Sequence, residues 1–88
     1  MESSQTDVDQ NLRVEVLARL LTDNRTRTAA LRVGVLNGIA HLAGKVKSVE
    51  ARSAAEEVAW QVRGVRGVVN RIEAPGAPDP ARTINIKL

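Results

Sequence analysis

The chain has 88 residues, with 13 lysines and arginines against 10 aspartates and glutamates, a net charge of +3 and a pI near 10.2. It has no cysteine and one histidine, which excludes a disulfide framework, a cysteine-based metal site and a histidine-rich metal site. No run of about 18 apolar residues is present, so no transmembrane segment is expected. A chain of this length forms one small domain with a thin core, which is aliphatic because Trp60 is the one aromatic residue.

The first segment, residues 1–7, is polar and is predicted to be a disordered leader. It lacks the apolar stretch of a signal peptide, so we expect a cytoplasmic protein if the chain is complete, and a periplasmic or envelope protein if it was cut from an exported one. A helix then starts at an N-cap, Thr6, and continues to about residues 22–24. Its apolar stripe has helical spacing and consists of Leu12, Val16, Leu17, Leu20 and Leu21.

A hairpin is predicted around Asn37-Gly38, because these residues adopt the positive φ angles of a two-residue type I′ turn most easily. The flanking strands run over about residues 30–36 and 39–46. Since side chains alternate between the faces of a strand, the turn fixes which residues share a face. The inner face carries Leu31, Val33, Val35, Ala40, Leu42 and Val46. The outer face carries Arg32, Gly34, Leu36, Ile39, His41, Ala43 and Lys45.

A second helix is predicted from the N-cap Ser48 to about residue 62, with Gly64 as a left-handed cap residue after it. A third strand follows over about residues 68–74, with Asn70 on its inward face and Arg71 on its outward face. Residues 75–88 form a proline-rich linker and a tail. The alternating stretch from Thr83 to Leu88 predicts either an extra edge strand or a tail that docks on a partner.

The element order is therefore αββαβ, an α+β fold with two helices packed on one face of a three-stranded mixed sheet. The second helix connects strands 39–46 and 68–74, and such crossovers are right-handed with parallel strands. We place strand 30–36 in the centre of the sheet, antiparallel to both neighbours.

The spacing of these residues resembles that of the BON domain (bacterial OsmY and nodulation). The resemblance lies in three stretches: Val33-x-Val35-x-Asn37-Gly38-x-Ala40-x-Leu42-x-Gly44-x-Val46, Ala54-x(3)-Val58-Ala59, and Gly64-Val65-x-Gly67-Val68-Val69-Asn70-x-Ile72. It predicts a BON-like domain over residues 8–74. It implies a bacterial non-catalytic module, associated with envelope, osmotic-stress and regulatory proteins, that is proposed to bind phospholipid surfaces or other macromolecules. Asn37, Gly38, Gly44, Gly64, Gly67 and Asn70 are interpreted as structural.

The candidate ligand-binding residues lie mainly on the uncovered face of the predicted sheet: Arg32, His41, Lys45 and Arg71, with Lys47 following at a strand end. A cationic sheet suits the phosphates of a lipid surface or of nucleic acid. The alternative is ordinary solubilising charge and protection of strand edges. His41 is either a solvated residue or a pH-sensitive contact to an anion.

Trp60 is predicted on a polar helix face, where an indole marks an interface or a membrane headgroup region. The alternative is that the ring folds over neighbouring side chains or is covered by the tail. Leu36 and Ile39 are further candidate contacts on the outer sheet face.

The stretch from Gly64 to Gly67 matches the GxxG loop of nucleic-acid-binding KH domains, but here it joins a helix to a strand, which favours a cap and a turn. The outer sheet face has no aromatic residue on which bases would stack, which argues against nucleic-acid binding.

The leading functional prediction is a non-catalytic module that binds anionic phospholipid surfaces or other macromolecules. The first alternative is an interaction or oligomerisation module of a larger regulatory or stress protein, which leaves self-association open. The second is KH-like nucleic-acid binding. No acid, base or nucleophile constellation is present, so no catalytic residue, cofactor or metal is expected.

Overall fold

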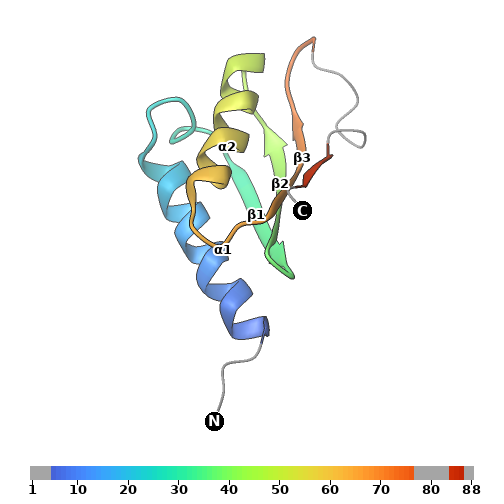
Figure 1. Cartoon of the computed structure of the whole chain (residues 1–88). Coiled ribbons are helices and arrows are strands. Elements are labelled where there is room, and N and C mark those ends of the chain that lie inside the picture. Colours follow the sequence, from blue (N-terminus) through green and yellow to red (C-terminus); the bar gives the residue numbers. More distant parts are fainter. Residues whose placement is uncertain (1–4, 77–83, 87–88) are drawn as a thin grey trace.

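The computed structural model describes residues 5–76 and the backbone of residues 84–86. The elements in chain order are α1 (Gln5–Thr22), β1 (Leu31–Leu36), β2 (Ile39–Lys45), α2 (Val49–Gln61), β3 (Gly67–Glu73) and β4 (Ile84–Ile86). Figure 1 shows α1 and α2 on the same side of the sheet, and no described helix covers the other side, which we call the open face. This arrangement confirms the α+β fold class and the order αββαβ.

The sheet order is β1-β2-β3-β4, so β2 lies between β1 and β3. The expectation that the first strand is central is therefore wrong. β2 pairs antiparallel with β1 and parallel with β3. After β2 the chain crosses over through α2 and returns as β3, which pairs with the edge of β2 that β1 leaves free. The outer edge of β1 instead faces α1, whose Arg13 donates a hydrogen bond from Nε to the carbonyl oxygen of Val33 at 3.1 Å.

The hairpin has the predicted register, with Leu36 opposite Ile39. Asn37 and Gly38 have φ angles of 52° and 78°, as a type I′ turn requires. The core lies between the inner sheet face and the two helices, and its largest fully buried apolar side chains are Leu20, Leu42, Ile72, Val16, Val62 and Val68. α2 also contributes the buried alanines Ala54, Ala55 and Ala59, whose small size allows the helix to approach the sheet closely.

The start of α1 differs from the prediction. The helix begins at Gln5, so residues 5–7 are helical and Thr6 is not an N-cap; residues 1–4 lie outside the described part. Asp9 instead accepts hydrogen bonds from the backbone N–H groups of Asn37 at 2.8 Å and Gly38 at 2.9 Å. This carboxylate ties the helix to the hairpin turn.

The described part of the tail contributes one strand. β4 pairs antiparallel with the first three residues of β3, with Val68 opposite Asn85. The sheet therefore has four strands, one more than the three of the αββαβ core. Residues 77–83 and 87–88, which belong to the predicted linker and tail, lie outside the described residues.

Candidate anion-binding surface

The uncovered face of the sheet has two chemically different ends. The cross-strand register places Arg32, Ala43 and Arg71 in one row across β1, β2 and β3. Lys45 follows at the end of β2 nearest this row, and we call these three cations the basic end. Lys47, after the end of β2, instead lines a second cavity beside the start of α2. The opposite end of the face carries Leu36 and Ile39, which are paired across the hairpin, and we call this pair the apolar end.

The basic end contains a shallow cavity of about 350 Å³. Its lining includes two small residues, Ala43 and Gly44. Because their side chains are small, the space between the flanking side chains stays open. Arg32 and Arg71 stand on either side of Ala43, about 10 Å apart at their Cα atoms given the ordinary spacing of two strand steps. The remaining lining residues are Ala30, Lys45 and Glu73. An anion seated over Ala43 would thus have a guanidinium on each side.

The cations of the basic end have no carboxylate partner among the residues with described side chains. Ion pairs elsewhere in that part of the chain include those of Arg19 with Glu15 and of Arg25 with Asp23 and Glu57. Glu73 lies opposite Lys45 in the strand register, yet the two form no ion pair. Positive charge therefore exceeds negative charge at this end, where Glu73 is the one carboxylate among the residues that line the cavity.

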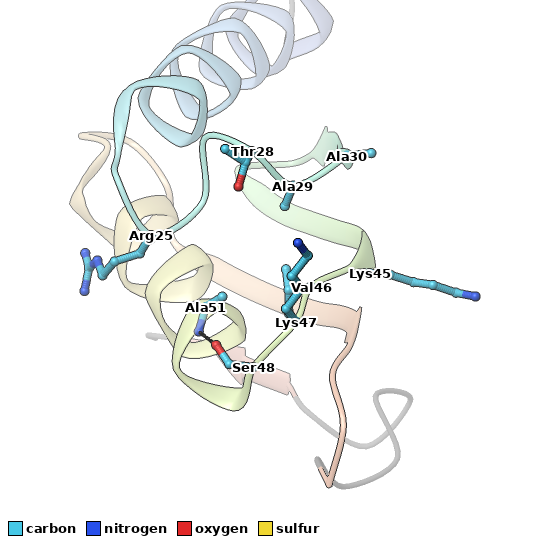
Figure 2. Close-up of a pocket in the computed structure, with 9 residues that line it drawn as sticks. All are labelled: Arg25, Thr28, Ala29, Ala30, Lys45, Val46, Lys47, Ser48 and Ala51. Atoms are coloured by element: carbon cyan, nitrogen blue, oxygen red, sulfur yellow. Dashed lines mark hydrogen bonds between the residues drawn. The ribbon is translucent and has the colours of Figure 1, made fainter.

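A second cavity of about 260 Å³ adjoins the basic end at the start of α2 (Figure 2). It lies between the loop after α1, the end of β2 and the first turn of α2. Its lining residues are Arg25, Thr28, Ala29, Ala30, Lys45, Val46, Lys47, Ser48 and Ala51. Figure 2 shows Arg25 and Lys45 directed away from the cavity on opposite sides. The Ser48 hydroxyl accepts a hydrogen bond from the N–H of Ala51 at 3.1 Å. It thereby satisfies one of the backbone N–H groups that have no partner within the helix, as predicted for an N-cap.

Arg25 is held by acidic neighbours and is not available to an anion in the second cavity. Its Nε and Nη2 atoms donate to the two carboxylate oxygens of Asp23 at 3.0 Å, and Nη2 also lies 3.4 Å from Glu57. The side-chain hydrogen bond with Asp23 is the largest cause that raises the pKa of Arg25, and it also holds the pKa of the Asp23 carboxyl below its usual value. The candidate anion site is therefore the open sheet face rather than the second cavity.

The structure does not bring Trp60 together with the basic residues. Trp60 belongs to α2, on the opposite side of the sheet, where its half-buried ring packs against the core. His41 is exposed on the open face, between Gly34 and Val69 in the strand register. At the apolar end Leu36 is 64% exposed, whereas Ile39 is half-buried.

The loop from Gly64 to Gly67 folds against the hairpin. Gly64 has a φ of +105°, and the N–H of Arg66 donates to the carbonyl oxygen of Gly38 at 2.9 Å. Gly67 is buried at the first position of β3. The loop thus joins a helix to a strand, in contrast to the loop between two helices in KH domains.

Sequence reasoning missed a buried polar network between α2 and β3. Arg52 donates from Nε to the carbonyl oxygen of Ile72 at 2.9 Å and from Nη2 to that of Asn70 at 3.2 Å. The Asn70 amide donates to the Arg52 carbonyl and to Glu56, each at 3.2 Å, and accepts the N–H of Ile72 at 3.1 Å. An asparagine on the inward face of a strand was the available signal, because a buried amide needs partners.

Within residues 5–76, no cluster of three histidine, aspartate or glutamate side chains is placed to hold a metal ion. No described helix is long and apolar enough to cross a membrane.

Comparison with known protein families identifies the family of this chain. The model of the BON domain family matches residues 8–76, which include most of α1 and all of β1, β2, α2 and β3. No curated protein matches the chain.

Proposed function

Because the chain belongs to the BON domain family, a family of non-enzymatic binding modules, we propose that its ligand is an anionic phospholipid surface and that the basic end of the open sheet face makes the contact. One observation carries this proposal. Three cations, Arg32, Lys45 and Arg71, gather at one end of the open sheet face and form no ion pair with a carboxylate among the described side chains.

The arrangement suits headgroup phosphates for electrostatic reasons. A lysine or arginine near an anionic membrane surface contributes about 1 kcal/mol to binding. One guanidinium group can donate two parallel hydrogen bonds to the oxygens of a phosphate. Arg32 and Arg71 can therefore bind one phosphate between them, over Ala43. The attraction acts within a Debye length of about 8 Å at physiological salt, so binding weakens as salt rises.

The test is co-sedimentation with vesicles of phosphatidylcholine alone and of phosphatidylcholine with 40% phosphatidylglycerol. We expect the wild-type chain to bind only the anionic vesicles, and less at high salt. The variant Arg32→Glu/Arg71→Glu should bind at least about tenfold more weakly, since two charges of the surface are reversed.

The matched control is Arg63→Glu/Arg66→Glu, which makes the same change in net charge at exposed positions in the segment between α2 and β3. It should lose less than about threefold, because these residues lie away from the basic end. If the two variants lost vesicle binding equally, net charge alone would explain the binding and the basic end would not be the contact. If the wild-type chain showed no preference for anionic vesicles, the lipid proposal would be refuted.

A second candidate function, contact with another protein through the apolar end, has one supporting observation. Leu36 exposes 64% of its surface on the open face, beside Ile39. If this end mediates self-association, sedimentation at rising concentration should show a dimer that Leu36→Ser abolishes. A wild-type chain that stays monomeric at millimolar concentration would exclude self-association.

A further inference from the structure

The outer edge of β3 is divided into two parts. Glu73 accepts the N–H of Val46 with its carbonyl oxygen at 3.0 Å, so its backbone groups point towards β2. Because the direction alternates along a strand, those of Val68, Asn70 and Ile72 point the other way, to the outer edge. On this edge, Arg52 already donates to the carbonyl oxygens of Asn70 and Ile72, and the Asn70 side chain accepts the N–H of Ile72. Val68 is left as the position where another strand can pair.

Trp60 lies beside this position. Arg52, Glu56 and Trp60 follow one another at four-residue intervals on α2, and each interval advances about 6 Å along the helix. Arg52 contacts residues 70 and 72 of β3 and Glu56 contacts Asn70, so the next step brings Trp60 level with Val68. Two residues of a strand advance by a similar distance, about 6.6 Å, which keeps the helix and the strand in step.

The chain's own strand β4 pairs at this part of the edge (Figure 1). It contacts three residues, Gly67, Val68 and Val69, and it lies outside residues 8–76, the part that matches the family. Ten residues, 74–83, separate it from β3. They can span up to about 33 Å, whereas the return from Glu73 to Val69 needs about 13 Å. A three-residue strand on such a long connection is among the first parts of a fold to open.

We propose that the edge of β3 at Gly67–Val69, beside Trp60, is a binding site for an extended peptide segment of another protein. The segment adds to the sheet as a strand antiparallel to β3, and β4 occupies the site when no partner is bound. Backbone hydrogen bonds at Val68 supply the contact, as in other modules in which an edge strand beside a helix receives a peptide. The site is separate from the basic end, so it stands or falls independently of lipid binding.

The test uses the full chain with β4 released. Asn85→Pro removes the backbone N–H that faces Val68, whereas the control Asn85→Ala keeps it. The probe is a synthetic peptide of residues 82–88, Arg-Thr-Ile-Asn-Ile-Lys-Leu, because its register on β3 is known for the central residues. Trp60 fluorescence reports directly on binding, since the chain has no other tryptophan and no tyrosine. Amide shifts of Gly67–Val69 locate the peptide.

We expect the peptide to bind Asn85→Pro about tenfold more tightly than Asn85→Ala, which corresponds to an edge that is open in about one molecule in ten of the control. The same peptide with proline at its central position should not bind. The family match ends at residue 76, before β4, so both variants should keep the αββαβ fold, which circular dichroism measures.

Three results would overturn the proposal: no binding to Asn85→Pro at millimolar peptide, equal binding to both variants, or amide shifts away from Gly67–Val69. A wild-type dimer that Asn85→Pro abolishes would also overturn the choice of partner, because the occupant would then be a second copy of this chain.

Discussion

Asn70 offers the sharpest test of what holds α2 on the sheet. Its side chain is fully buried and makes three hydrogen bonds, two as donor and one as acceptor of the Ile72 N–H. In Asn70→Ala the Ile72 N–H loses its side-chain partner at the outer edge of β3, and an unsatisfied buried donor costs about 1–3 kcal/mol. A small void adds about 1 kcal/mol. We therefore expect the free energy of unfolding to fall by about 3 kcal/mol.

This loss is large for a chain of 88 residues, whose total free energy of unfolding is on the order of 4–13 kcal/mol. It should lower the melting temperature by about 12–24 °C, given about 4–8 °C per kcal/mol for a domain of this size. Urea unfolding followed by circular dichroism and Trp60 fluorescence measures the change. The control is Ser53→Ala at an exposed position of α2, and its free energy of unfolding should stay within about 0.5 kcal/mol of wild type.

A second variant separates hydrogen bonding from packing. Asn70→Leu keeps the same number of side-chain heavy atoms and so leaves no void, but it removes the acceptor of the Ile72 N–H. It should therefore recover about 1 kcal/mol relative to Asn70→Ala and remain less stable than wild type. If either variant loses less than about 1 kcal/mol, the network does not stabilise the fold as argued.

Two further predictions concern the hairpin. Burial alone would raise the pKa of Asp9, but hydrogen bonds from Gln5, Asn37 and Gly38 outweigh it and lower this pKa, so the carboxylate's contribution to stability is complete above about pH 4 and is lost as the pH falls through the lowered folded-state pKa. When the free energy of unfolding is measured against pH in the acid range, Asp9→Asn should therefore lose stability less steeply than wild type. An identical decline in the two proteins would contradict the role of this carboxylate. At Gly44, which has a φ of +129°, a Cβ would lie 2.6 Å from the Ala30 carbonyl oxygen, so Gly44→Ala should lower the free energy of unfolding in urea by at least about 2 kcal/mol. The control is Gly34→Ala, where a Cβ would meet no atom within 4 Å, and this variant should be as stable as wild type or more stable. Equal effects of the two substitutions would refute the argument from the close approach at Gly44.

The hairpin shows why part of the fold was predictable from local sequence. Asn37-Gly38 specifies a two-residue turn, and the turn alone fixes every pairing from Leu36 opposite Ile39 to Leu31 opposite Gly44. Once the register is known, the inner and outer faces follow by alternation. The same local logic applies to the N-cap Ser48, whose hydroxyl accepts the N–H of Ala51.

Strand order was not predictable in this way, because it depends on which edge of the hairpin is free. The first helix lies along β1, where Arg13 bonds to Val33, and β3 therefore joins β2. Nothing in the spacing of the apolar residues records that choice. Local sequence likewise does not indicate the role of Asp9, since its partners at the hairpin turn lie 28 and 29 residues further along the chain.

The candidate site was partly accessible from sequence. Alternation placed Arg32, Lys45 and Arg71 on one face, and the cross-strand register then placed the two arginines on either side of Ala43. The cavity over Ala43 and the lack of carboxylate partners there required side-chain positions. Trp60 required them too, because helix geometry alone did not show that its ring packs against the core.

The most direct test of the lipid proposal is a map of backbone amide shifts during titration with anionic bicelles, with zwitterionic bicelles as the control. We expect shifts and line broadening at Arg32, Ala43, Lys45 and Arg71, which depend on the anionic lipid and disappear at high salt. The indole N–H of Trp60 should not respond, because it lies on the other side of the sheet. Shifts centred on Trp60 and α2, with none at the basic end, would contradict the proposal.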